Sequence, residues 1–483
     1  MATISSVGIG SGLDANGIIA KLVALEKQPL TALATRATNI QSQISAFGQI
    51  QSQFSALADV ASRISDATTW SARSASSSNT NAATITAARS ANATSFTLDI
   101  DALALRQSIS SPPLTAGAAV GAGTLSLQLG TWASVGTSFT PASGSAAVVI
   151  AVGAADTVAD IANKINAAGA GVVATTFNDG MQDRLLLQSK GTGEAAGFRV
   201  QSADAALAPL IFDPQNSPGV GMASTGISIQ YGQNAKARIN GLQVTSATNT
   251  LSGNIPGVTI NLLSTTTTGY GTVGEVKSPA TMSISEDVTP SVKNVQDFVV
   301  AYNTLNQSLT DLTRYDASTK SAGLFQGDST VVGMQNVLRS MIGSASLGLT
   351  SQRLSDVGIQ SLRDGSLAIN TSKLSTAANN GTSLQQLFTT NNGNPLTNGF
   401  ALKFKTLAQG VLATGGSVTN EASALKRLLA QNASAQTKVN DRAAVIEIRL
   451  KAQYSALDAQ MGSLNALSAY VTQQVTLWNK NTA

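Results

Sequence analysis

The chain contains neither cysteine nor histidine among its 483 residues. It therefore lacks disulfide bonds, thiol nucleophiles, imidazole bases and the usual protein ligands of zinc and copper. Aromatic residues make up 4% and charged residues 12% of the sequence, and much of the 43% hydrophobic fraction is alanine, which fills little volume. We therefore expect no enzyme, no cofactor and no metal site, and a structure of long helices and Ser/Thr-rich strands rather than one dense core.

Targeting and membrane signals are also missing. The opening MATISSVGIGSGLD is rich in glycine and serine and nearly uncharged, unlike a secretory signal peptide. The longest apolar run, near Ala146–Ala155, is far shorter than the roughly 20 residues that span a bilayer. The sequence predicts no membrane span, and if the chain is exported, we expect export without a cleaved secretory signal. The absence of cysteine leaves the compartment open.

The net charge of +4 is a weak basic bias for a chain of this length. The densest basic stretch is interrupted by acidic residues: Lys438, Asp441, Arg442, Glu447, Arg449 and Lys451. Nucleic-acid binders usually gather basic residues on one face and interleave aromatic ones. We interpret this stretch as the solvated flank of a paired helix and expect no nucleic-acid partner.

Both ends of the chain have the spacing of helices that need a partner helix. Near the C-terminus apolar residues recur every seven positions, with companions between them: Val439, Ile446, Leu450, Leu457, Leu464, Leu467 and Val471. Near the N-terminus, Asp14 is a candidate helix cap and Pro29 interrupts the helix. The apolar residues before the proline are Ile18, Leu22 and Leu25, and those after it are Ile40, Ile44, Phe47, Phe54, Leu57 and Ile64. Because both ends carry such a stripe, we expect the ends to pair, although each helix could instead lie on a globular core.

The middle of the chain is typical of strands and turns. A strand–helix–strand–strand pattern occupies residues 114–235, with Thr157 as the cap of its short helix, and Asn240-Gly241 marks a hairpin in the strands that follow. A long helix is predicted from Thr289-Pro290, with Val295, Val299 and Tyr302 on its apolar face. The predicted fold class is multidomain α+β. Paired terminal helices, which form coiled-coil-like legs and a helical shaft, enclose nested β-rich inserted domains.

This pattern divides the chain into seven segments. We predict an N-terminal leg (1–40), a shaft helix (41–75), a β-rich domain in two parts (76–113 and 236–285), an inserted β-rich domain (114–235), a helical shaft domain (286–440) and a C-terminal leg helix (441–483).

Candidate chemical sites are weak. Gly8-Ile9-Gly10-Ser11-Gly12 resembles a phosphate-binding loop, but no strand precedes it and no Lys-Ser/Thr follows, so a flexible terminus is the better interpretation. Asp99 and Asp101 share a strand face, and without a polar cluster around them we expect solvated side chains. No nucleophile, base and orienting group stand in a recognisable arrangement, so we predict no catalytic residue.

Several segments together resemble one family, the flagellar hook-associated protein 2 family, whose members cap the bacterial flagellar filament. The segments are Ile4–Asp14, the stretch from Ala237 through Asn240-Gly241, Asn249 and Gly257-Val258-Thr259 to Asp287, then Phe298–Asn303 and Leu324–Ser329. Thr157–Asn166, Gly171-Val172 and Arg184-Leu185 are similar to an insertion motif of flagellar axial proteins, whereas residues 114–150 match nothing that we can place.

The resemblance implies a structural cap at the distal end of the filament, which retains exported flagellin and promotes its insertion and polymerisation. It implies export by the flagellar type III pathway and a ring-shaped homo-oligomer, pentameric or hexameric, with strand domains in the plate of the ring. The implied partners are flagellin, the hook-associated junction proteins and an export chaperone.

On this interpretation two groups of residues carry the function. The expected leg pairing and filament contacts are Leu13, Ile18, Leu22, Leu25, Ile446, Leu450, Leu457, Leu464, Leu467 and Val471. The expected shaft packing residues are Ile44, Phe47, Phe54, Val295, Val299 and Tyr302. Gln453 and Gln460 interrupt the leg stripe, so we expect a weak seam that lets a leg detach and dock again.

Two other functions fit parts of the pattern. Another axial protein, either flagellin or a hook–filament junction protein, would share the paired terminal helices. A surface adhesin that binds mucin or glycan would use the strand domains, although Trp132 is the one tryptophan of the inserted module.

Overall fold

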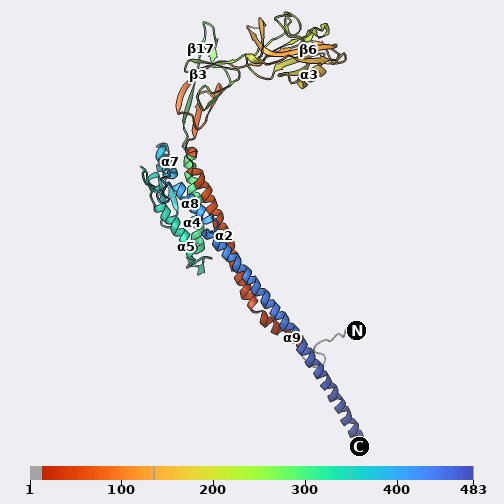
Figure 1. Ribbon diagram of the computed structural model, residues 1–483, viewed down its shortest axis with the longest axis vertical. Helices are drawn as coiled ribbons and strands as arrows, with labels where there is room; N and C mark the ends of the chain where they lie inside the picture. The colour runs from red at the N-terminus through yellow and green to blue at the C-terminus, as the bar shows by residue number, and fades with distance from the viewer. Residues whose placement is uncertain (1–13, 134–135, 350, 482–483) are drawn as a thin grey trace. The chain divides into compact units, whose positions relative to one another are not determined.

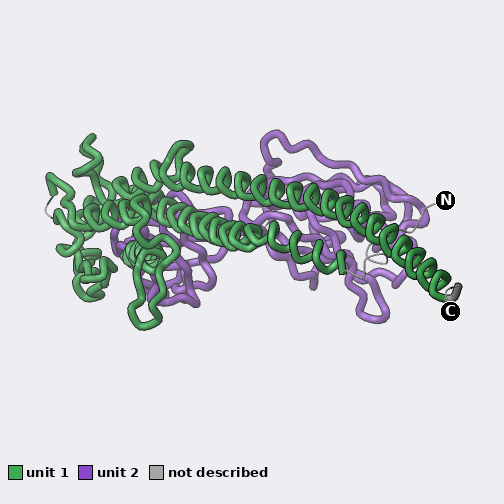
Figure 2. Tube along the Cα trace, turned by 90° about the horizontal axis from the view of Figure 1, so that it is seen from below, with its two compact units in different colours: residues 1–70, 288–483 green, residues 71–287 purple. Residues whose placement is uncertain are grey.

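The computed structural model describes residues 14–133, 136–349 and 351–481. They form two compact units, shown in different colours in Figure 2. The helical unit contains residues up to 70 and from 288 onwards, and the β-rich unit contains residues 71–287. One unit is thus built from both ends of the chain and the other from its middle, which confirms the predicted α+β class with paired terminal helices.

Local sequence signals fix the first helices of the helical unit. Helix α1 (Ala15–Lys27) begins after Asp14, whose carboxylate accepts a hydrogen bond of 2.8 Å from the Gly17 amide. Helix α2 (Pro29–Ser65) begins at the proline, which has no amide hydrogen to offer a preceding turn. The predicted cap and the predicted break are both confirmed. The remaining helices are α4 (Thr289–Thr313), α5 (Ser329–Gly343), α6 (Thr371–Asn379), α7 (Thr382–Thr389), α8 (Phe400–Leu412) and α9 (Ser417–Asn481), with two short hairpins, β19 (Tyr315–Asp316) with β20 (Ser321–Ala322) and β21 (Ile359–Ser361) with β22 (Leu367–Ile369).

The core of the helical unit lies among α2, α4, α5 and α8, which we call the bundle. Helix α2 contacts both α4 and α8, and α4 contacts α5 (Figure 1). Aromatic rings fill its centre: Phe298 and Tyr302 of α4 meet Phe404 of α8 edge-on, with centroids 5.1 and 5.9 Å apart. Such rings bury much apolar area and prefer this edge-to-face geometry.

The β-rich unit is built on a five-stranded antiparallel sheet. Its strand order is β1 (Arg73–Ser77), β18 (Ala280–Glu286), β3 (Thr94–Ala102), β12 (Ala235–Ile239) and β13 (Leu242–Ser246). Asn240 and Gly241 join β12 to β13 with φ angles of 49° and 82°, the left-handed region that a tight hairpin requires, so the predicted hairpin is confirmed. A second sheet of β14 (Thr250–Ser252), β15 (Val258–Leu262) and β2 (Ala83–Ala87) shares its hydrophobic core, and β16 (Thr267–Thr268) pairs with β17 (Val276–Lys277).

The inserted part of the β-rich unit has its own hydrophobic core. In one sheet β10 (Gln182–Ser189) pairs with β4 (Ser108–Ser110), β5 (Leu114–Thr115) and β9 (Val172–Asn178), and in the other β6 (Gly123–Ala133) pairs with β7 (Ser138–Pro141), β8 (Val148–Val152) and β11 (Gly197–Gln201). Helix α3 (Val158–Ala167) begins with a capping box in which Thr157 and Asp160 bond each other's amides. Its apolar face, Val158, Ile161 and Ile165, is buried as the sequence predicts.

Three local features depart from what the sequence alone suggests. Residues 74–77 of the polar stretch 74–81 belong to β1, because the pairing of β1 with β18 supplies backbone hydrogen bonds that the side chains do not reveal. Thr289 does not cap α4; it is already helical, and Val288 holds the cap position without a side-chain bond. Helix α6 was not predicted, although Asn370 caps it by accepting from the Lys373 amide.

Asp99 and Asp101 are buried, which corrects the expectation of solvated carboxylates. The guanidinium of Arg238 donates to both carboxylate oxygens of Asp101 at 2.8 Å, and Thr267 donates a third hydrogen bond at 2.7 Å. Arg238 also donates to Glu275 at 2.7 Å. Neighbouring strands thus bring the cation to a carboxylate whose side chain is fully shielded from solvent. A buried carboxylate needs such partners because desolvation penalises its charge.

This ion-pair network predicts a specific sensitivity to acid. The hydrogen bond from Arg238 holds the pKa of Glu275 at about 2, below its ordinary value of 4.5. A lowered folded-state pKa contributes stability above about pH 4.5 that is lost as the pH falls towards 2. We expect the urea midpoint of the β-rich unit to fall less between pH 6 and pH 3 in Glu275→Gln than in the wild type. Equal falls in both proteins would contradict the role of this carboxylate.

Candidate functional site

The pair of helices at the chain ends is the first candidate site. Helix α1 packs against α9 through the buried side chains of Ile19 and Val23, which meet Ala443, with Leu450 and Tyr454 packed beside them. The small Ala443 lets the two helices approach closely. Glu26 and Arg442 form an ion pair of 3.2 Å across the helices, but Arg442 is exposed and Glu26 only half-buried, so the ion pair adds little stability. Apolar packing therefore holds this pair together.

The packed face of α1 is not the predicted one. Ile18 is half-buried, whereas Leu22 and Leu25 are exposed, Leu25 by 58%. Helix α1 carries two adjacent apolar stripes, and the stripe with four-residue spacing, Ala15, Ile19 and Val23, is the buried one. That spacing is visible in the sequence as a second candidate face, but only the position of α9 decides which of the two stripes is buried. Leu13 and the Gly8–Gly12 segment lie outside the described residues.

The predicted stripe of α9 is covered along part of its length. Ile446 and Leu450 are half-buried, and Leu450 packs against the cluster that joins α1 to α9. Beyond Tyr454 the predicted residues are exposed: Leu457 43%, Leu464 56%, Leu467 57% and Val471 51%, and the stripe continues to Trp478 at 73%. Rows of large apolar side chains of this length mark surfaces that bind another protein.

The predicted shaft residues lie in the core of the bundle. Phe47, Phe54, Val295, Val299 and Tyr302 are buried, and Ile44 packs against the same core. The Tyr302 hydroxyl donates to the Gly365 carbonyl oxygen at 2.9 Å, and burial raises its pKa to about 12. These side chains fix the spacing of the helices, and they are not available to a partner chain.

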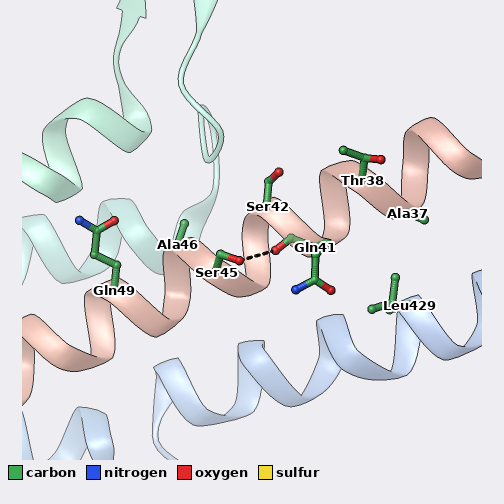
Figure 3. A pocket seen from close by; sticks show the side chains of 8 residues that line it. All are labelled: Ala37, Thr38, Gln41, Ser42, Ser45, Ala46, Gln49 and Leu429. Atoms are coloured by element: carbon green, nitrogen blue, oxygen red, sulfur yellow. Dashed lines mark hydrogen bonds between the residues drawn. The ribbon is translucent and has the colours of Figure 1, made fainter.

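A groove of about 690 Å³ runs beside α2 and α9 (Figure 3). Gln41 of α2 and Leu429 of α9 point into the space between the helices, and the Ser45 hydroxyl bonds the Gln41 carbonyl oxygen at 3.0 Å. The remaining lining side chains are all uncharged: Ala37, Thr38, Ser42, Ala46 and Gln49. It holds no charged group that could act in catalysis.

The described residues offer no other centre of chemistry. Within the described ranges no three acidic side chains gather as metal ligands. No helix in that part of the chain is long and apolar enough to cross a membrane. The helical unit is made from both chain ends, a β-rich unit is inserted between them, and the last helix carries a solvent-exposed apolar stripe. These features define a structural assembly protein.

Comparisons with known proteins identify the family. Models of the flagellar hook-associated protein 2 N-terminus and C-terminus match residues 11–107 and 232–466, and a model of the flagellin hook IN motif matches residues 134–191. The chain belongs to the flagellar hook-associated protein 2 family.

Individual relatives match along nearly the whole chain. The B-type flagellar hook-associated protein 2 of Pseudomonas aeruginosa is 26% identical over 97% of this chain and 97% of its own length. Flagellar hook-associated protein 2 of Escherichia coli is 27% identical over 98% of both. Among solved structures, the D1-D2-D3 domains of the flagellar cap protein FliD from Escherichia coli match with a TM-score of 0.58 and 25% identity, covering 79% of this chain and 99% of that one.

Proposed function

We infer that this protein is the structural cap at the distal end of the bacterial flagellar filament, where it retains exported flagellin and promotes its insertion and polymerisation. The observation that carries this conclusion is the match to the family over residues 11–107 and 232–466, which include most of the helical unit and parts of the β-rich unit. The protein is secreted and acts at the filament tip.

We further propose that the legs are the parts that dock on the filament. In this proposal residues 1–40 and 441–483 are legs, and the exposed stripe of α9, together with Leu22 and Leu25, packs against flagellin. This proposal is supported by the apolar character of these side chains and, beyond Tyr454, by their exposure to solvent. The shaft would comprise 41–75 and 286–440, and the plate 76–285 with its inserted domain at 114–235.

The assembly we propose is a ring of five or six copies. An export chaperone would cover the apolar stripe before assembly, and the hook-associated junction proteins would receive the first ring. An adhesin receives no support from Trp132, because that side chain is buried and its indole donates to the Phe198 carbonyl oxygen at 2.9 Å.

Deletion of the gene tests the capping function. We expect bald or stubby cells and abundant flagellin in the culture medium that stays in the supernatant after ultracentrifugation, because nothing retains the exported subunits. The intact gene supplied on a plasmid should restore filaments and remove the leaked monomer. Normal filaments without leaked flagellin would contradict the cap.

A further inference from the structure

Strand β9 is an edge strand in the inserted part of the β-rich unit. It pairs with β10 along its whole length, from Val172 opposite Ser189 to Asn178 opposite Asp183. On its other side it pairs with no strand of the described residues. An edge strand presents unpaired amide and carbonyl groups, which a strand from another chain can use to extend the sheet.

The register shows which backbone groups of β9 face the open edge. Along an antiparallel strand, alternate residues form hydrogen bonds to opposite sides. The Leu185 carbonyl oxygen of β10 accepts from the Ser111 amide at 2.9 Å, on the side of β4. Every second residue of β10 from Leu185 onwards therefore faces β4. The β9 residues opposite this set direct their amide and carbonyl groups away from β10, and they are Val172, Ala174 and Thr176.

The side chain of Asn166 occupies the middle of this open edge. Asn166 lies in the last turn of α3, next to the buried Ile165. Its Nδ2 donates to the Ala174 carbonyl oxygen at 2.8 Å, and its Oδ1 accepts from the Ala174 amide at 2.9 Å. A side-chain amide carries the same kinds of donor and acceptor as a peptide group. Asn166 thus satisfies both backbone groups of Ala174 as a neighbouring strand would.

The composition of β9 favours association through an open edge. Its sequence, VVATTFN, contains neither a charged residue nor a proline, which are two features that protect edge strands. Val173 and Phe177 are exposed on its outer face, and Met181 is exposed in the loop that follows. Uncharged strands with high β-propensity are those that pair with copies of themselves. This edge therefore needs protection.

We propose that Asn166 blocks the β9 edge and thereby prevents β9 of one copy from pairing with β9 of another copy. The excluded partner is a second copy, because two identical antiparallel edges are self-complementary about a two-fold axis. With Asn166 bound to Ala174, an incoming strand finds no free donor or acceptor at the centre of β9. This role does not depend on the proposed capping function, so the gene-deletion experiment leaves it untouched.

Amide exchange in the full-length wild type tests the block without any substitution. We expect the Ala174 amide to exchange roughly tenfold or more slowly than the Thr176 amide. Both amides face the open edge, but Asn166 accepts from the amide of Ala174. Hydrogen–deuterium exchange with mass spectrometry that resolves single residues measures both rates. Equal exchange at the two positions would overturn the proposal.

Asn166→Ala removes the block and should cause self-association. In sedimentation velocity of the full-length protein, we expect half-association at a protein concentration lower than that of the wild type by roughly tenfold or more. Deuterium uptake of residues 172–178 should then fall as the protein concentration rises. The matched control is Asn163→Ala, which removes an exposed asparagine from the same helix and should behave like the wild type.

A second substitution separates blocking from a general contribution of Asn166 to stability. Thr176→Pro removes an amide that faces the open edge and keeps the pairing with β10, and proline on an edge strand opposes further pairing. We therefore expect Asn166→Ala combined with Thr176→Pro to associate like the wild type. A merely destabilised protein would not be rescued in this way.

Three results would contradict the block. Asn166→Ala that associates like the wild type would show that the edge needs no protection. Association that persists with Thr176→Pro, or protection from exchange outside residues 172–178, would show that β9 is not the contact. Circular dichroism establishes folding, and if Asn166→Ala does not fold, the exchange rates of the wild type decide.

Discussion

We expect Phe298→Ala to lower the free energy of unfolding of the helical unit by about 3–5 kcal/mol, the usual cost of removing a buried phenylalanine. Phe298 is fully buried, and its ring lies 5.1 Å from that of Phe404 and 5.7 Å from that of Phe388. Alanine would leave a cavity where three helices, α4, α7 and α8, meet. Urea denaturation followed by the helical circular dichroism signal measures the loss.

The control for this variant is another large apolar residue outside the core. Ile448 of α9 is 70% exposed, so Ile448→Ala should change the free energy of unfolding by less than about 0.5 kcal/mol. A loss below about 1 kcal/mol in Phe298→Ala would mean that the aromatic cluster does not hold the bundle together.

Removal of residues 455–483 should abolish capping and leave the core of the helical unit intact. The deleted segment carries the exposed stripe of α9, whereas the hydrophobic core of the helical unit is built from residues up to Leu429. The thermal midpoint should therefore stay within a few degrees of the wild type. In the deletion strain, this variant should leave flagellin in the medium at the level seen without any cap gene.

A point variant separates the apolar stripe from the length of the helix. Leu464→Ser with Leu467→Ser removes two stripe residues, and we expect leaked flagellin again. The matched control is Ser463→Ala with Ser468→Ala, which changes neighbouring exposed positions and keeps the stripe. If the leucine variant caps filaments as well as the control, the stripe is not the filament contact.

The sequence predicted those parts of the fold that depend on neighbouring residues. Asp14 at the start of α1, Pro29 at the start of α2 and Thr157 at the start of α3 each act within one helical turn. The Asn240-Gly241 hairpin is equally local. These signals place the elements, and the apolar spacing at both ends predicted that distant helices pair.

Features that depend on distant partners were not predictable in this way. The burial of Asp101 requires Arg238 from another strand, and β1 has polar side chains whose strand character comes from pairing with β18. The choice between two apolar stripes on α1 depends on where α9 lies. Ala443 stands seven residues before Leu450, on the heptad series, but the small alanine side chain gives only a weak apolar signal. The site is thus predicted as a pair of legs, but its buried face is not.

The pairing of β1 with β18 also bears on how the chain folds. Arg73 lies opposite Glu286, and the Asp287 amide donates to the Ala72 carbonyl oxygen at 2.9 Å, so the chain enters and leaves the β-rich unit at the same place. Once that unit has folded, the segments that become α2 and α4 are already neighbours, and most of the entropy of closing the long loop between them has been lost beforehand. The folded β-rich unit therefore keeps the end of the α2 segment close to the start of the α4 segment. We expect the helical core to form after the β-rich unit has folded.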